Sequence, residues 1–162
     1  FDLHKLLRPM DQDDRERILE KLWFWAGNVM SPRSNRKVMS VAELLELTNN
    51  KLIEVGAHAM SHVPLTILQA DEQRHEIMGS KEKLEQILNC SIHAFAYPYG
   101  DISTGVGNTI LDFVQQSGFN MACSTMSGLV TSATNPFLLP RCLVRDWTGD
   151  EFSRRLWGFF AQ

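Results

Sequence analysis

Short apolar runs alternate with amphipathic segments from about residue 41 onward, and this alternation limits the fold more than any other feature of the sequence. Because strands that alternate with helices favour parallel pairing, we expect an α/β fold, a mainly parallel sheet covered by helices. The expected elements are helices over about 41–48, 71–88, 108–118 and 149–160, and strands over 52–55, 93–95, 121–125 and 138–144.

A helical lead-in precedes this alternation. Apolar residues at helical spacing predict helices over 2–8 and 12–26, and the acidic DQDD suits the start of the second helix. The polar segment MSPRSNRK predicts a loop, and Ser40 with Glu43 three residues later has the form of a capping box. We therefore expect a single domain, divided into a lead-in over 1–37 and a core over 38–162.

Composition excludes several classes of function. The chain has 162 residues and a formal net charge of −3, so no basic surface argues for nucleic-acid binding. No apolar run approaches the roughly 20 residues of a membrane span. The three cysteines, Cys90, Cys123 and Cys142, form no CxxC, and we interpret them as buried, reduced thiols. Reduced thiols favour a reducing compartment, and hence a cytoplasmic location.

Polar and aromatic residues follow the predicted strands. His58 and His62 come after LIEV, residues 97–101 come after HAF, Arg141 lies within LLPRCLV, and Trp147 follows that run. Parallel α/β folds carry their chemistry at the carboxyl ends of the strands. We therefore expect these three segments to meet at one face of the sheet.

Each segment has an alternative interpretation when taken alone. Two imidazoles four residues apart can reach one cation, or they can be half-exposed histidines at a helix start. Ala59 stands where the HExxH metalloprotease motif needs glutamate. AYPYGD is either a simple turn or a turn that directs a backbone N–H at an oxyanion. Arg141 in an apolar run needs a partner, either a site carboxylate or a structural acid.

The order GAHAMSHVPL, FAYPYGD and LPRCLVRDW resembles the motifs of the polysaccharide deacetylase family, the NodB-homology group similar to carbohydrate esterase family 4. The resemblance extends over roughly residues 38–155. It implies a deformed (β/α) barrel and a divalent cation, often zinc, held by two histidines and one aspartate. It also implies a second aspartate that acts as base while water attacks the acetamide of an N-acetylated sugar.

The resemblance implies roles for six residues: metal ligands His58 and His62, an oxyanion-facing N–H at Tyr99, substrate contacts at Pro98 and Trp147, and Arg141 to position the catalytic carboxylate. Other parts of the family pattern are missing. No aspartate pair of the TFDDG type precedes the histidines, and no histidine follows His93 to act as general acid. The third metal ligand, the base and the acid are therefore absent from this sequence.

These observations predict a partial deacetylase barrel that corresponds to the C-terminal portion of the family fold. The expected function is metal-dependent hydrolysis of the acetamide C–N bond in an N-acetylated polysaccharide or glycan precursor, with this chain inactive alone. Hydrolysis of an O-acetyl ester bond, in place of the amide bond, stays open as another reaction. The alternative is a non-catalytic domain that binds glycan or serves in assembly. A homodimer is also expected, because missing first strands would leave an unpaired sheet edge at or beside LIEV.

Overall fold

The computed structural model describes residues 2–27, 37–50, 52–100 and 106–160. Its centre is a parallel pair of short strands, β1 (Ala94–Ala96) and β2 (Met121–Cys123), with Phe95 opposite Ala122. Parallel pairing of these two segments was predicted from the alternation of strands and helices. The structure is therefore of mixed helix and strand type with parallel strands, as expected.

Two further segments contact this pair through single bridges. Ala57 forms a parallel bridge with Phe95, and Leu139 forms one with Cys123. The four extended segments therefore lie side by side in the order Ala57, β1, β2 and Leu139. Homodimer formation through an outer edge of this arrangement stays a prediction.

The predicted strands over 52–55 and 138–144 are wrong, because neither segment is a strand in the structure. The first segment reaches the sheet at Ala57, whose N–H donates to Ala94 O and whose carbonyl accepts from Ala96 N. It then leaves the sheet at Ala59, where φ is +62°. The second segment pairs with β2 only at Leu139, because the next donor along it, Arg141 N, bonds to Met126 O beyond the end of β2. Arg141 therefore does not lie in a strand.

All six predicted helices are present. Asp11 accepts a hydrogen bond from Asp14 N, Ser40 and Glu43 form the expected capping box, and the chain turns out of α5 at Gly118 with φ +73°. The predicted loop at 30–37 lies almost wholly outside the described residues. The helices are α1 (Leu3–Leu7), α2 (Gln12–Trp25), α3 (Val41–Thr48), α4 (Ala70–Leu88), α5 (Asn108–Gln116) and α6 (Gly149–Phe160), with a 3-10 turn η2 (Leu65–Ile67).

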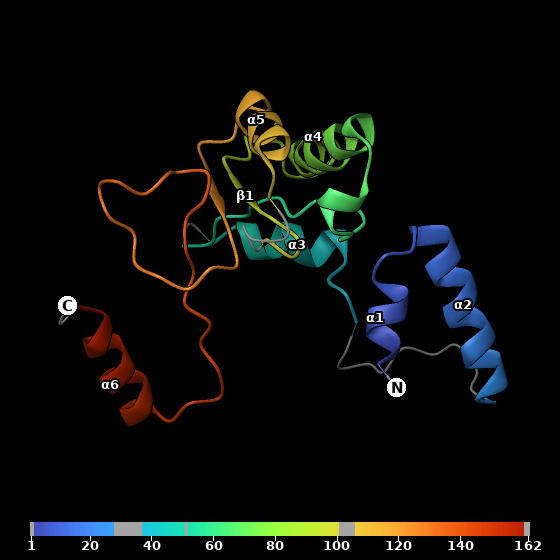
Figure 1. Ribbon diagram of the computed structural model, residues 1–162, viewed down its shortest axis with the longest axis horizontal. Helices are drawn as coiled ribbons and strands as arrows, with labels where there is room; N and C mark the ends of the chain where they lie inside the picture. The colour runs from blue at the N-terminus through green and yellow to red at the C-terminus, as the bar shows by residue number, and fades with distance from the viewer. Residues whose placement is uncertain (1, 28–36, 51, 101–105, 161–162) are drawn as a thin grey trace.

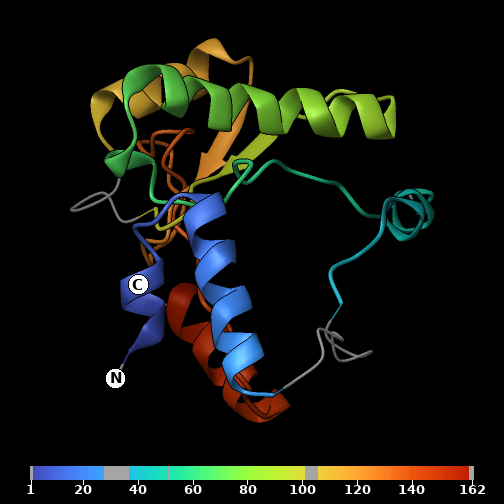
Figure 2. The ribbon, with the colours of Figure 1, turned by 90° about the vertical axis from the view of Figure 1, so that its right-hand side faces the viewer.

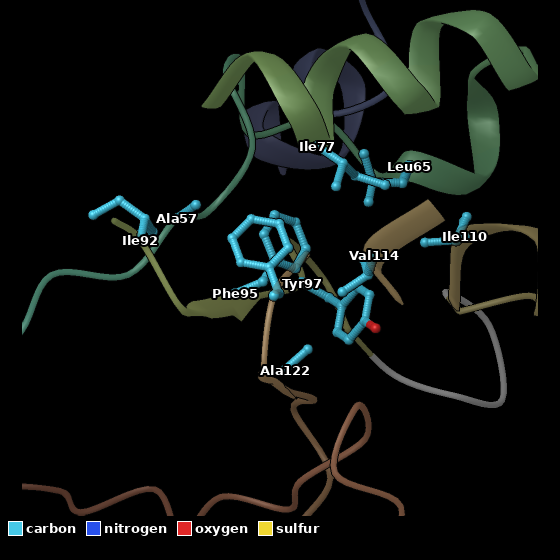
Figure 3. Close-up of a cluster of buried hydrophobic side chains, with 10 residues drawn as sticks. Ala57, Leu65, Ile77, Ile92, Phe95, Tyr97, Ile110, Val114 and Ala122 are labelled. Atoms are coloured by element: carbon cyan, nitrogen blue, oxygen red, sulfur yellow. The ribbon is translucent and has the colours of Figure 1, made fainter. Parts of the chain in front are cut away.

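The core lies where α4 and α5 cover one face of the strands (Figure 1). Phe95 is at its centre, with its ring centroid 5.2 Å from that of Tyr97 and 5.3 Å from that of Phe119. Burial raises the pKa of the Tyr97 hydroxyl, which donates to Phe137 O at 3.0 Å. This packing fixes the end of β1. The ten core residues, most of them labelled in Figure 3, are Ala57, Leu65, Ile77, Ile92, Phe95, Tyr97, Ile110, Val114, Phe119 and Ala122.

The remaining helices surround this body at its margins. The α1–α2 hairpin and α6 lie on the side of the strands away from α4, at opposite ends of the molecule (Figures 1 and 2). None of the residues of α2, α3 or α6 is buried. No helix within the described ranges has both the length and the apolar character needed to cross a membrane.

The three cysteines are free, but the prediction that they are buried is wrong for two of them. Cys90 and Cys142 are exposed, and Cys123 is half-buried. Cys90 follows the end of α4 at Asn89, and Cys142 follows the last residues that pair with β2. Both positions lie just beyond packed elements, where the side chain has no core to enter.

Candidate active site

His58 comes directly after the bridge at Ala57, so the sheet fixes its backbone. Its Nδ1 lies 2.6 Å from Ala96 O at the end of β1. A carbonyl oxygen can only accept, so Nδ1 carries the proton and donates in this contact. Nε2 then keeps its lone pair, which is the arrangement seen when a backbone carbonyl orients a metal-binding histidine.

His62 returns to His58 through a tight loop. The two ring centroids are 4.8 Å apart, and the rings lie edge to face. Ala59 and His62 have φ values of +62° and +56°, a left-handed conformation that non-glycine residues rarely adopt. Such conformations are found most often at functional sites, where the surrounding structure holds them in place.

The environment of His62 favours its neutral form. Desolvation lowers the pKa of this imidazole. Repulsion from His58, Arg15 and His4 in their charged forms lowers the pKa further, against a backbone hydrogen bond that raises it. A neutral imidazole is the form that binds a metal ion. The lowered pKa of His62 therefore favours metal binding, and the two rings have the spacing of two metal ligands.

Tyr99 lies in the turn after β1, next to His62. The two ring centroids are 5.1 Å apart, and Tyr99 has a φ of +53°. Within the described part of the chain, the Tyr99 backbone N–H makes no hydrogen bond, so it can donate to a bound group. Pro98 before it is buried, whereas Asp101 lies outside the described residues.

Gly100 completes this turn, and its lack of a side chain is required by packing. A Cβ there would lie 2.7 Å from Tyr97 Cβ, closer than side-chain atoms approach. The Gly100 carbonyl accepts from Thr125 N at 2.9 Å, so the turn is tied to the end of β2. The position of the Tyr99 N–H therefore depends on the body of the fold.

Glu76 of α4 contacts the histidine loop, and the sequence analysis did not identify it. Its Oε2 accepts from Met60 N at 2.8 Å and from Ser61 N at 2.9 Å, and its Oε1 accepts from Ser61 Oγ at 2.7 Å. The donors lie 15 and 16 residues away along the chain, and no sequence spacing indicates them.

The helical lead-in also contacts the site, which was not predicted. His4 Nε2 lies 3.4 Å from the Tyr99 hydroxyl, the Arg8 guanidinium carbon lies 3.8 Å from the Tyr99 ring centroid, and Arg15 donates to Ser61 O at 3.0 Å. A cavity of about 310 Å³ is formed here by Leu3, His4, Leu7, Arg8, Arg15 and Tyr99.

Arg141 and Trp147 do not contact the histidines. Arg141 Nε donates to Ser124 O at 2.6 Å, and no carboxylate forms an ion pair with it in the described ranges. Among the described residues, its hydrogen-bond partner is therefore a backbone carbonyl, near the Gly100 turn. Trp147 stacks against Arg155, with 4.4 Å from the guanidinium carbon to the ring centroid, and lines an apolar cavity beside α6.

The structure thus brings together two of the three predicted segments. His58, His62 and Tyr99 form one site, whereas Arg141 reaches it only through Ser124. Among the described residues, no cluster of three or more His, Cys, Asp or Glu side chains could hold a metal ion. The two histidines fit two coordination positions, and the rest of a ligand set is not present among these residues.

Comparison with known proteins identifies a family and similar folds. The sequence model of the family described as "Polysaccharide deacetylase" matches residues 22–122. Among solved structures, the deacetylase PplD of Streptococcus pyogenes in complex with acetate has a TM-score of 0.66 and 20% identity. The match covers 75% of this chain and 52% of that one. Among curated proteins, none matches this chain.

Two further structures have similar scores. The polysaccharide deacetylase BC0361 of Bacillus cereus has a TM-score of 0.61 at 22% identity, over 91% of this chain and 48% of that one. The putative polysaccharide deacetylase BA0330 of Bacillus anthracis has a TM-score of 0.61 at 23% identity, and the match covers 74% of this chain and 37% of that one. The chain therefore spans about half or less of the length of these structures. Since the family match covers more than half of the chain, this chain belongs to the polysaccharide deacetylase family.

Proposed function

We propose that this chain carries part of the active site of a metal-dependent hydrolase that removes acetyl groups from an N-acetylated polysaccharide or glycan precursor. One observation carries the proposal. The imidazoles of His58 and His62 lie 4.8 Å apart beside Tyr99, a residue in a left-handed turn whose backbone N–H has no acceptor within the described residues. This arrangement supports a site in which two imidazoles bind the metal ion and one backbone N–H serves as the oxyanion donor.

In the proposed reaction, water adds to the acetamide carbonyl carbon and the C–N bond then breaks, releasing acetate and a free amine on the sugar. A divalent cation, zinc by expectation, would act as a Lewis acid when bound. His58 and His62 would hold it through Nε2 and a neutral ring nitrogen. The Tyr99 N–H would donate to the oxygen that becomes negative in the tetrahedral intermediate. Pro98 shapes the turn that presents this N–H.

Arg141 and Trp147 keep only indirect roles in this proposal. Arg141 holds Ser124 O, and Ser124 packs against the Gly100 turn, so Arg141 supports the position of Tyr99. Trp147 would contact substrate only if the segment between Arg141 and α6 approached the histidines. The resemblance implied that Arg141 positions a catalytic carboxylate. In this proposal, that carboxylate would come from the additional residues that complete the site.

We further infer that the parallel segments at 57, β1, β2 and 139 are part of a deformed (β/α) barrel. The matched structures are about twice as long as the region that this chain spans, which leaves room for additional strands. The missing carboxylates, a third metal ligand and a general base, would come from an aspartate pair on such a strand. The four segments lie side by side in the same order as in the sequence, as neighbouring strands of a parallel barrel do.

The second candidate is a non-catalytic domain that binds glycan or serves in assembly. The observation in its favour is the absence, in the described ranges, of any metal-binding cluster of three side chains. Loss of a base would leave the oxyanion donor and the aromatic turn able to contact an acetyl group without hydrolysing it. The two candidates differ in whether a carboxylate pair completes the site.

Acetate release separates the candidates. The 162-residue chain alone, with added zinc or cobalt, is expected to release no measurable acetate from N-acetylglucosamine oligomers. A missing general base alone costs about 10²–10⁴-fold in rate. A version that includes an aspartate pair of the TFDDG type is expected to release acetate, and His58→Ala is expected to abolish that activity. If that version binds metal and deacetylates no glycan, the binding-domain candidate replaces the enzyme.

A further inference from the structure

The loop between the two histidines is held by one carboxylate from the next helix. Glu76 accepts three hydrogen bonds from this loop, two from backbone N–H groups and one from Ser61 Oγ. We propose that Glu76 is a positioning residue for metal binding: it holds the loop in the one conformation that directs His58 and His62 at the same cation. This inference rests on the proposed function, in which the two histidines are metal ligands.

The loop needs such support because its backbone is in an unfavourable conformation. Ala59 and His62, on either side of the Glu76 contacts, both have φ in the left-handed region. Left-handed non-glycine residues persist where the surrounding structure over-determines them. Hydrogen bonds to an ionised carboxylate are roughly twice as strong as neutral ones. Three such bonds therefore stabilise a conformation that the residues of the loop do not favour by themselves.

Glu76 is fixed by the core on which α4 packs. The next residue, Ile77, is fully buried, and Ser80 one turn later is buried and hydrogen-bonded to Ile77 O. On the other side of the loop, Arg15 donates to Ser61 O at 3.0 Å. Ser61 is therefore held through its N–H, its hydroxyl and its carbonyl. A small shift of Ser61 would move His62, the next residue, away from His58.

Glu76 is better explained as a positioning residue than as the third metal ligand. Each of its oxygens already accepts from at least one loop donor, at 2.7–2.9 Å. No group of three potential ligands that includes Glu76 is found among the described residues. Three of the roughly four lone-pair sites of the carboxylate are occupied by loop donors, which leaves little capacity for a metal ion. The two roles also predict different effects for Ser61→Ala, which removes one loop contact and leaves the carboxylate in place.

The main test variant is Glu76→Gln. The neutral amide keeps the shape of the side chain but removes its negative charge, so the two loop N–H groups that donate to Oε2 keep only a weaker, neutral acceptor. Groups that orient metal ligands change metal affinity by about 10–100-fold when they are mutated. We expect Glu76→Gln to weaken zinc binding by about 10-fold or more, and Ser61→Ala to weaken it by a smaller factor. The matched control is Glu82→Gln, an exposed carboxylate on the same helix, which should bind zinc as the unmodified chain does.

The experiment follows the histidine ring signals of the full chain by NMR during zinc titration, together with amide hydrogen exchange and denaturant unfolding. The inference predicts weaker zinc binding and faster exchange of the Met60 and Ser61 amides in Glu76→Gln, with an unfolding midpoint close to that of Glu82→Gln. Equal zinc affinity in Glu76→Gln and Glu82→Gln would overturn it. Weaker binding in Glu76→Gln with full affinity in Ser61→Ala would also overturn it and would make Glu76 a ligand. If the unmodified chain binds no zinc, the proposed function fails, while the amide exchange still tests the support of the loop.

Discussion

The central body and the terminal helices of this chain differ in how they use their apolar residues. The body of α4, α5, β1 and β2 encloses a core of ten buried side chains. In α2 and α6 no residue is buried, and Trp25 and Trp157 are 85% and 74% exposed. Yet both kinds of helix have apolar residues at helical spacing. Amphipathic spacing therefore predicts that a helix forms, but not that its apolar face has a partner.

The site lies on the boundary between these two regions. The body supplies His58, His62 and the Tyr99 turn, and the α1–α2 hairpin adds Arg8 and Arg15 from outside. The groups proposed to do chemistry are thus held by buried packing and backbone hydrogen bonds. The contacts from the hairpin involve long side chains on a region that packs little. We expect the body to determine the stability of the fold, and the terminal helices to contribute little to that stability.

The largest expected effect is on the core. Phe95→Ala should lower the free energy of unfolding by about 3–5 kcal/mol, because Phe95 packs on both Tyr97 and Phe119 and its removal leaves a cavity. Trp25→Ala on α2 removes a larger side chain, yet it should change the free energy of unfolding by about 0.5 kcal/mol or less. Denaturant unfolding measures both. Equal losses for the two variants would mean that α2 packs as firmly as the body.

The next effect concerns two glycines. Gly100→Ala should lower the free energy of unfolding by about 1–3 kcal/mol, because the new Cβ would lie 2.7 Å from Tyr97 Cβ. Gly158→Ala on α6 meets no atom within 4 Å. It should be neutral or stabilise the helix by up to about 1 kcal/mol, since alanine is the better helix former. Thermal unfolding compares them, and a tolerated Gly100→Ala would show that the Tyr99 turn is not held as tightly as its contacts indicate.

The smallest expected effect is a pH-dependent change in the stability of the fold. The Ile92 N–H and Lys81 hydrogen-bond the Glu85 carboxylate and hold its pKa below its usual value of 4.5. Because the folded pKa is lowered, this stabilisation is present above about pH 4.5 and is lost as the pH falls through the folded pKa. Glu85→Gln should therefore be less stable than the unmodified chain at pH 7, and the difference should narrow under acid. Glu151→Gln, which breaks an exposed pair with Arg155 on α6, should cost only about 0.3–0.5 kcal/mol at pH 7. A difference for Glu85→Gln that stays constant from pH 7 to pH 3 would contradict this account.

Sequence reasoning succeeded where the causes are local. Helical spacing and the Ser40–Glu43 capping box predicted the helices, and the His-x-x-x-His and PYG patterns predicted the segments that form the site. It failed where the causes lie far apart in the chain. The contact of His4 with Tyr99 spans 95 residues, and the partner of Arg141 is a backbone carbonyl that no side-chain pattern indicates. The strands at 52–55 and 138–144 were overestimated because an apolar run alone supplies no paired neighbour, and most residues of both runs are exposed.

Zinc titration of the chain by calorimetry tests the central claim most directly. The account predicts binding that is weaker than that of sites with three or four protein ligands, because only two ligands are present among the described residues. It predicts that this binding disappears in the His58→Ala, His62→Ala double variant, while His75→Ala, on the exposed surface of α4, leaves it unchanged. Binding that survives the double variant, or an unmodified chain that binds no zinc, would contradict the assignment of His58 and His62 as metal ligands.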